Sequence, residues 1–360
     1  MRRTQRKHRP VRLALYGANA ILLVMSLLSL WPLGCAGDSD GGSAGAVVVY
    51  CSVDIGFAEP ILDDFTRETG IRVHRQFDTE AGKTTGLLHK LLAERQNPRA
   101  DVWWSSEIFG TMQLAADGVL DAYRPTTADD IPRQYRDRAD RWTAFGLRGR
   151  VLAYDPKRTR AEDLPRRWCD LVDPKYRGRV AMADPRFGTT RGHMATLLSL
   201  WGEPAMMKFY EGLRGNGFHR SDGNSHSVLM LVRGVVDYAA TDTDDVIVAQ
   251  QRGDSIAMVY PDLDTPDGKG PAAGTLWIPC SVALVNGAPH GSVARKLIDY
   301  LASAKIEERL YASDSRNVPV RPGLRKKLGA SAPGESDVDY AAAAAMLDRS
   351  DALVTDVLLK

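Results

Sequence analysis

The regular alternation of short apolar runs with amphipathic segments constrains the fold of this 360-residue chain more than any other feature. Residues 46–50 and 71–77 have the β-branched composition or the alternating polarity of strands, and residues 57–69 space their apolar side chains as an amphipathic helix does. A helix over residues 84–94 and a strand over residues 100–104 continue the pattern. Strands that alternate with helices at this spacing predict an α/β fold, with a mixed, mostly parallel sheet flanked by helices.

The middle of the chain predicts a second unit of the same kind. Residues 142–154 are β-like and long enough to pass from one lobe to another, and residues 275–285 are a candidate for a second crossing. Strands are predicted at residues 179–183 and 235–240, and a helix over residues 190–201. A body of this length is too large for one small core and suits two lobes.

These crossings predict the organisation of the whole chain. Helices are expected at residues 293–302, 306–311 and 341–347, the last being an alanine-rich terminal helix of high propensity. We expect, in order, a lipoprotein signal peptide, a flexible tether, a first lobe with a return segment, a second lobe, and C-terminal helices that pack on the lobes: residues 1–34, 35–46, 47–145 with 275–290, 146–274 and 291–360.

The first fifty residues predict export. A basic segment at residues 1–12 precedes an apolar stretch at residues 13–33, as in a secretory signal. An uncleaved membrane anchor and an ordinary cleaved signal peptide are two interpretations. Leu33-Gly34-Cys35-Ala36 supports a third, because it resembles a lipobox in which Cys35 is lipidated, with Pro32 at the usual leucine position. Each interpretation places the body outside the cytoplasm, and a diacyl group would anchor it to the membrane.

Charge and cysteine content exclude several classes of function. The chain has 47 Lys and Arg against 45 Asp and Glu, and much of the positive charge lies in the leader, so no basic stripe predicts nucleic-acid binding. The spacing of the four cysteines resembles no zinc motif. Cys51 and Cys280 are expected near the floor of a cleft, either as two separate buried thiols or as a disulfide. We expect a monomer.

Polar side chains follow two of the predicted strands. In parallel sheets ligands bind at the carboxyl ends of strands, and this rule selects residues 51–54 and 105–107. The ligand candidates from these segments are Ser52, Asp54, Ser105, Ser106 and Glu107.

An acidic run follows the strand predicted at residues 235–240, and it adds Asp242, Thr243 and Asp244 to the ligand candidates. The four carboxylates that would surround one cleft suit a metal ion or an organic cation, and they are Asp54, Glu107, Asp242 and Asp244. The alternative is that Asp242, Asp244 and Asp245 cap the helix that follows. One run could serve both purposes.

Residues 184–190 follow a predicted strand and open a helix, which is a natural place for an anion. Arg186 offers a guanidinium fork for a carboxylate or phosphonate, and Thr189 offers a hydroxyl. A loop that ends in an N-capping threonine is the alternative. Trp103 and Trp104 point to opposite faces of their strand, so one is expected in the core, whereas the other could line the cleft and meet a cation.

Several segments, in this order and spacing, carry a resemblance to a known family. They are Tyr50-Cys51-Ser52-Val53-Asp54, Ala100-Asp101-Val102-Trp103-Trp104-Ser105-Ser106-Glu107, Thr241-Asp242-Thr243-Asp244-Asp245 and Ile278-Pro279-Cys280-Ser281-Val282-Ala283-Leu284-Val285. From residue 47 to residue 323 the chain resembles the extracellular solute-binding proteins of the ferric-iron type, which are two-lobed periplasmic binding proteins. The resemblance implies two lobes joined by a hinge, which close on a small ligand and present it to the permease of an ABC transporter.

The ferric members of that family hold the metal with two adjacent tyrosines, and the matching place, residues 241–245, contains none. The main hypothesis is an exported, lipid-anchored binding protein of an ABC importer, with no catalytic activity and no required cofactor. By resemblance its ligand is Fe(III) or another metal. The alternatives are an organic cation, a phosphonate-like anion, a sensory module for a membrane receptor, and a lipid-anchored metal-dependent enzyme that uses the carboxylate cluster.

Overall fold

The computed structural model describes residues 45–78, 82–268 and 273–360. The chain divides into two units, Met1–Ser43 and Ala44–Lys360, and all that follows concerns the second. The predicted signal peptide, Cys35 and most of the predicted tether therefore lie outside the described residues. Among the residues that are described, the helices are too short or too polar for any of them to cross a membrane.

Ten strands form one sheet in the order β2-β1-β3-β10-β5-β8-β6-β7, with β4 beside β10 and β9 beside β5. The strands are β1 (Ala46–Cys51), β2 (Arg72–Phe77), β3 (Val102–Ser105), β4 (Leu120–Asp121), β5 (Thr143–Tyr154), β6 (Val180–Ala183), β7 (His219–Ser221), β8 (Tyr238–Asp242), β9 (Ala257–Val259) and β10 (Trp277–Val285). β1 pairs in parallel with β2 and β3, and β6 pairs in parallel with β7 and β8. The other five pairings, all of which involve β5 or β10, are antiparallel. The predicted mixed α/β architecture is confirmed, but the sheet is not mostly parallel.

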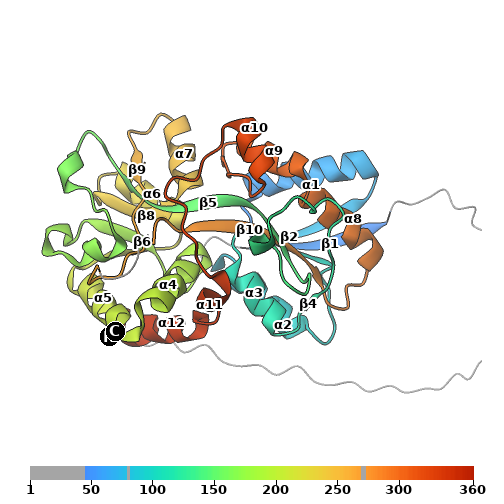
Figure 1. Ribbon diagram of the computed structural model, residues 1–360, viewed down its shortest axis with the longest axis horizontal. Helices are drawn as coiled ribbons and strands as arrows, with labels where there is room; N and C mark the ends of the chain where they lie inside the picture. The colour runs from blue at the N-terminus through green and yellow to red at the C-terminus, as the bar shows by residue number, and fades with distance from the viewer. Residues whose placement is uncertain (1–44, 79–81, 269–272) are drawn as a thin grey trace, which may run out of the picture. The chain divides into compact units, whose positions relative to one another are not determined.

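The helices of the described residues cover this sheet and extend to the C-terminus (Figure 1). They are α1 (Ile55–Thr69), α2 (Thr85–Glu94), α3 (Phe109–Ala116), α4 (Gly188–Trp201), α5 (Glu203–Gly215), α6 (Asn224–Val232), α7 (Thr243–Gln251), α8 (Gly291–Leu301), α9 (Ala304–Ala312), α10 (Pro322–Leu328), α11 (Tyr340–Ala344) and α12 (Leu347–Leu353). The helices α5 and α6 were not predicted from the sequence.

The long strand β5 connects the two lobes, as its length predicts (Figure 1). Its first part, from Thr143 to Gly149, pairs with β10, and its second part, from Arg150 to Tyr154, pairs with β8. β10 begins beside Gly149, where β5 changes partner. We call the side with β1, β2, β3 and β10 the first lobe, and the side with β6, β7 and β8 the second lobe.

The C-terminal helices pack against both lobes. α11 packs on α3 of the first lobe and on α4 of the second, and α12 packs on α4. The helix predicted at residues 341–347 is observed as α11, but it ends at Ala344, and a second helix, α12, begins at Leu347. Leu347 and Leu353 of α12 are buried.

Two predictions concerned buried residues: that one of the two tryptophans of β3 could line a cleft, and that two cysteines could form a disulfide. Trp103 and Trp104 are both fully buried, in different clusters on the two faces of the sheet, so neither lines a cleft. Cys51 and Cys280 are buried and free, which confirms separate thiols and excludes the disulfide. Both faces of β3 are covered, because a strand in the middle of a sheet packs against helices on each side.

A polar pocket between the two lobes

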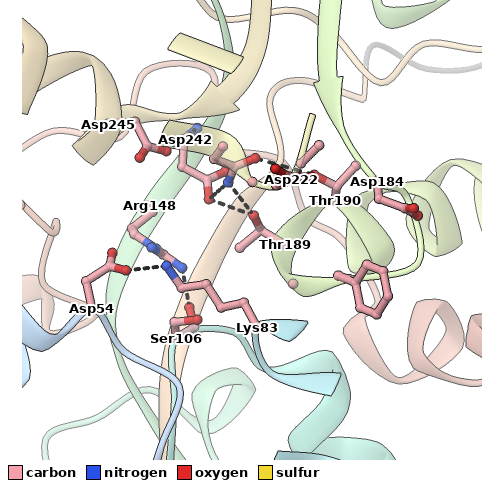
Figure 2. Close-up of a pocket in the computed structure, with 15 residues that line it drawn as sticks. Asp54, Lys83, Ser106, Arg148, Asp184, Thr189, Thr190, Asp222, Asp242 and Asp245 are labelled. Atoms are coloured by element: carbon pink, nitrogen blue, oxygen red, sulfur yellow. Dashed lines mark hydrogen bonds and ion pairs between the residues drawn. The ribbon is translucent and has the colours of Figure 1, made fainter. Parts of the chain in front are cut away.

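A small polar pocket lies where the loops of the two lobes meet (Figure 2). Its volume is about 30 Å³. We call it the polar pocket, and it is lined by Asp54, Lys83, Ser106, Arg148, Ala183, Asp184, Phe187, Gly188, Thr189, Thr190, Asp222, Gly223, Asn224, Asp242 and Asp245.

The first lobe contributes three polar residues from its strand-end and helix-start loops. Asp54 precedes α1, Lys83 lies just before α2, and Ser106 follows β3. Lys83 forms an ion pair with Asp54. Burial opposes the charge on Asp54, but the ammonium of Lys83 outweighs it and lowers the pKa of the carboxyl group. The side chains of this wall therefore remain charged while they are largely enclosed.

The second lobe contributes the beginning of α4. Phe187 stands at the N-cap position, and its hydrocarbon side chain cannot accept a hydrogen bond. The first N–H groups of a helix have no partner within the helix. The N–H of Gly188 donates to the carbonyl oxygen of Lys83 at 3.2 Å. The N–H groups of Thr189 and Thr190 are therefore those that remain for water or a ligand. Gly188 begins the helix at a positive φ of 54°, a conformation that favours glycine. The N-terminus of α4 thus offers the pocket a partial positive charge.

Arg148 of β5 stands between the lobes (Figure 2). Its Nη1 donates to Asp244 at 2.8 Å and its Nη2 donates to the carbonyl oxygen of Ser106 at 2.6 Å. Burial disfavours its charge, but Asp244 and Asp242 outweigh burial and raise the pKa of the guanidinium further. Among the described residues, the Nε of Arg148 is one of the few buried side-chain nitrogens without a hydrogen-bond partner. Arg148 is therefore a buried, paired cation whose Nε–H has no hydrogen-bond partner.

Asp242 is held by neutral and cationic donors of the second lobe. Thr189 donates to it at 2.7 Å and Asn224 at 2.9 Å. Arg150, which follows Arg148 on the same face of β5, approaches the other carboxylate oxygen at 3.2 Å. The side chain of Asp242 also caps α7 in a reciprocal capping box with Asp245. The capping interpretation of the acidic run is confirmed for these two residues.

Asp242, Asp244 and Asp245 bring three carboxylates within 4.8 Å of one another, a spacing that could hold a metal ion. Their oxygens are already engaged, however, because Asp242 and Asp244 accept from arginines and Asp245 accepts from Thr241 at 2.7 Å. Burial, together with the negative charges of Asp244 and Asp242, raises the pKa of Asp245 well above its ordinary value. A metal ion would have to displace two arginines, so the cluster is a poor fit for a cation of high charge.

The structure brings four of the sequence-selected residues together on the polar pocket: Asp54, Ser106, Thr189 and Asp242. The other six are next to it but do not line it: Ser52, Ser105, Glu107, Arg186, Thr243 and Asp244. Most of these six form hydrogen bonds or ion pairs with other residues of the protein. The hydroxyl of Ser52 contacts that of Ser105 at 3.3 Å, and the hydroxyl of Thr243 accepts from the backbone N–H of Gly149 at 3.2 Å. Arg186 forks onto Asp184, with one contact at 2.6 Å, so this guanidinium is used within the protein.

Glu107 caps α3 instead of facing the pocket. Its carboxyl group accepts from the backbone N–H of Phe109 at 2.6 Å and from that of Gly110 at 3.1 Å. Burial raises the pKa of Glu107 to about 7 against the opposing effect of these N–H groups. The metal role expected for Glu107 would require it to leave this cap.

Asp184 and Thr190 also line the polar pocket, and they belong to the segment of residues 184–190 in which an anion site was predicted. The sequence did not indicate four further lining residues: Lys83, Arg148, Asp222 and Asn224. Lys83 stands in Gly82-Lys83-Thr84, which only hints at a phosphate loop and lacks the preceding glycine. Arg148 has a weak signal in hindsight, because a charged residue inside an apolar crossing strand is buried only when it is paired.

Comparison with known proteins places this geometry in a family. Residues 110–339 match the family described as bacterial extracellular solute-binding protein. A putative 2-aminoethylphosphonate-binding periplasmic protein from Salmonella typhimurium is 26% identical over 294 residues, which are 80% of this chain and 78% of that protein. The major ferric iron-binding protein of Neisseria meningitidis is 25% identical over 268 residues, 74% of this chain and 78% of that protein.

The fold is also similar to that of a protein whose crystal structure has been solved. The crystal structure of iron-bound HitA from Pseudomonas aeruginosa superposes with a TM-score of 0.76 at 22% identity, covering 87% of this chain and 99% of that one. Two α/β lobes with a polar pocket between them define a two-lobed binding protein. The chain belongs to the bacterial extracellular solute-binding protein family, and it is a solute-binding component of an ABC transporter. Such proteins are non-enzymatic and act outside the cytoplasm, so the enzyme hypothesis is wrong.

Proposed function

We propose that this protein captures a small organic solute through an anionic group, a phosphonate, phosphate or carboxylate, and delivers it to the permease of an ABC importer. The observation that carries the proposal is the meeting of the α4 N-terminus with Arg148 on one pocket. A helix N-terminus binds anions through its N–H groups and its dipole. An arginine adds a charge-assisted hydrogen bond of the kind that phosphonates and carboxylates receive in proteins.

The ferric ion expected from the resemblance is the weaker candidate. No tyrosine or histidine is among the described residues that line the polar pocket. The carboxylates that do line it have partners within the protein: Asp54 pairs with Lys83, Asp184 with Arg186, Asp242 with Arg150 and Asp245 with the Thr241 hydroxyl, and Asp222 lies 3.5 Å from the imidazole of His226. One relative is named for ferric iron and another for an aminophosphonate, at nearly equal identity, so relatedness alone does not favour the metal.

Calorimetric titration of the full chain tests the proposal. The panel is methylphosphonate, inorganic phosphate, acetate and ferric citrate. We expect at least one of the first three to bind, with citrate alone as the control for the iron complex. Binding of iron by a chain that binds none of the simple anions would overturn the proposal.

Two matched arginine variants assign the binding to the polar pocket. Arg148→Lys keeps the charge but loses the planar set of donors, and it should weaken anion binding. Arg186→Lys is the control, because Arg186 is paired with Asp184 and does not line the pocket. Equal effects of the two substitutions would contradict the assignment.

The anchor and the assembly state complete the proposal. We infer from the lipobox-like segment that Cys35 carries a diacyl group and that a single copy works at the membrane surface. Mass spectrometry of the N-terminal peptide from the native host measures the modification, and Cys35→Ala should release the protein from the membrane. An unmodified Cys35 in a membrane-bound protein would contradict the lipid anchor.

A further inference from the structure

The polar pocket has room for very little besides a charged group. Its volume is about 30 Å³. A cavity needs roughly 10–15 Å³ for each water molecule, so the pocket accommodates about two or three waters. An organic solute whose anionic head lies here must place the rest of its atoms elsewhere.

A much larger cavity adjoins the polar pocket. Its volume is about 710 Å³, and it shares Asp54 and Asp245 with the lining of the polar pocket. We call it the apolar cavity after the five large hydrophobic residues in its lining: Phe57, Val228, Leu229, Val232 and Val248. The other residues that line it are Asp54, Gly56, Ser225, His226, Asp244, Asp245, Arg252 and Asp254. It lies between the beginning of α1 in the first lobe and α6 and α7 in the second.

Two of the five hydrophobic side chains that line this cavity are exposed, whereas Val228 is buried. Leu229 is 38% exposed and Val232 is 39% exposed, and both line the cavity. Ile55, which is 51% exposed, is next to the lining residue Gly56. Apolar surface that is left in water beside a polar site marks a place where a ligand or a partner gains by covering it. A concave site of several hundred Å³ that combines hydrophobic side chains with polar groups is also typical of pockets for organic ligands.

We propose that the carbon body of the solute, aromatic or aliphatic, occupies the apolar cavity while its anionic head occupies the polar pocket. The inference rests on the proposed function and specifies its substrate class as anions with a hydrophobic body. The adjacency of the two sites, which share Asp54 and Asp245 as lining residues, is what assigns the cavity to the solute. Closure of the lobes then buries α6 and the start of α1 against the same molecule.

Titration of the full chain with three probes tests the inference. Inorganic phosphate and methylphosphonate have only the head, whereas phenylphosphonate adds a ring at the position of the body. Phenylphosphonate should bind at least roughly tenfold more tightly than methylphosphonate, which corresponds to about 1.4 kcal/mol. Equal affinities would overturn the inference.

Gly56→Leu fills the cavity without touching the polar pocket. Gly56 is the second residue of α1, and a Cβ built there meets nothing within 4 Å. Leucine also has the higher helix propensity, so the variant should fold. It should abolish the advantage of phenylphosphonate and leave the affinity for methylphosphonate unchanged. Gly323→Leu is the matched control, since Gly323 is the second residue of α10 and its Cβ likewise meets open space.

The outcomes separate this inference from the proposed function. If the wild-type chain binds neither phosphate nor any phosphonate, the proposed function fails and the inference fails with it. If methylphosphonate binds but Gly56→Leu changes neither affinity, only the inference is overturned. If Gly56→Leu leaves both affinities intact and abolishes transport in permease vesicles, the cavity receives the permease, and the inference is again overturned.

Discussion

The polar pocket and the apolar cavity share two residues, but the protein treats them in opposite ways. In the polar pocket, Arg148, Asp54 and Asp242 already have protein partners, so its shape is fixed before a ligand arrives. In the apolar cavity, Leu229 and Val232 are left partly in water, so that surface is completed only by something that covers it. The difference indicates that one region sets the orientation of the ligand by preorganisation, and the other supplies affinity through burial.

Removal of Arg148 should break the polar pocket with the largest effect. Arg148→Met leaves Asp244 buried without its guanidinium partner, and such losses cost roughly 3–5 kcal/mol of unfolding free energy. Anion binding should be lost as well. Urea denaturation and calorimetric titration measure the two effects.

A double variant separates stability from binding. In Arg148→Met with Asp244→Leu, both members of the ion pair are replaced by apolar groups, which is often neutral for stability. Unfolding free energy should recover and anion binding should not. Recovery of binding would show that Arg148 acts only through Asp244.

The ionisation of Glu107 should make the unfolding free energy of the protein depend on pH. Its folded pKa is about 7 against an ordinary value of 4.5, so the folded chain retains a proton that the unfolded chain releases. The unfolding free energy of the wild type should therefore fall as pH rises from 4.5 to 7. At about 1.4 kcal/mol per pKa unit, the full effect is roughly 3 kcal/mol.

Glu107→Gln removes this titration and keeps an oxygen that can accept from the cap N–H groups. The stability difference between the variant and the wild type should grow in favour of the variant between pH 4.5 and 7, measured by thermal unfolding. A difference that does not change with pH would contradict the raised pKa.

A substitution at Gly192 should show how closely the two lobes pack against each other beside the polar pocket. A Cβ at Gly192 of α4 would lie 2.0 Å from a ring carbon of Phe109 in α3 of the other lobe. Gly192→Ala should cost roughly 1–3 kcal/mol of unfolding free energy by overpacking, although alanine favours a helix.

The matched control is Gly215→Ala at the end of α5, where a Cβ meets nothing within 4 Å. This variant should be neutral or more stable by up to about 1 kcal/mol. Phe109→Ala combined with Gly192→Ala should relieve the clash. If Gly192→Ala is as stable as its control in chemical denaturation, the lobes do not meet closely at this point.

Leu229 should have the smallest effect on stability and a clear effect on ligand affinity. Because its side chain is 38% exposed, Leu229→Ser should change the unfolding free energy by less than about 0.5 kcal/mol. It should weaken phenylphosphonate binding and leave methylphosphonate binding unchanged. A large loss of stability would place Leu229 in the core and weaken the contrast between the two regions.

The sequence predicted more of the fold than of the site. The crossing strand was expected at residues 142–154 and is observed at Thr143–Tyr154, because a long apolar β-like run is a local signal. Asp54, Ser106 and Asp242 were selected by their places at strand ends, and they line the polar pocket. These residues follow from topology, which alternation of elements specifies well.

The remaining parts of the site depend on contacts that no local pattern encodes. Arg148 lies beside the point at which β5 changes partner, and the sequence predicted a crossing strand without indicating at which residue the exchange falls. The apolar cavity requires α6, which was not predicted. Arg186 was selected as a ligand, but its own neighbour Asp184 holds it. Such local pairings compete with ligand binding and become visible only in the folded chain.

Native mass spectrometry of the full chain, purified without added ligand, is the most direct test of whether the protein binds an organic anion instead of iron. If the protein captures anions with a hydrophobic body, any molecule that it retains should be such an organic anion, and denaturation should release it. We also expect a mass shift on addition of phenylphosphonate and none on addition of ferric citrate beyond that of citrate. A stoichiometric iron adduct that phenylphosphonate fails to displace would contradict the account.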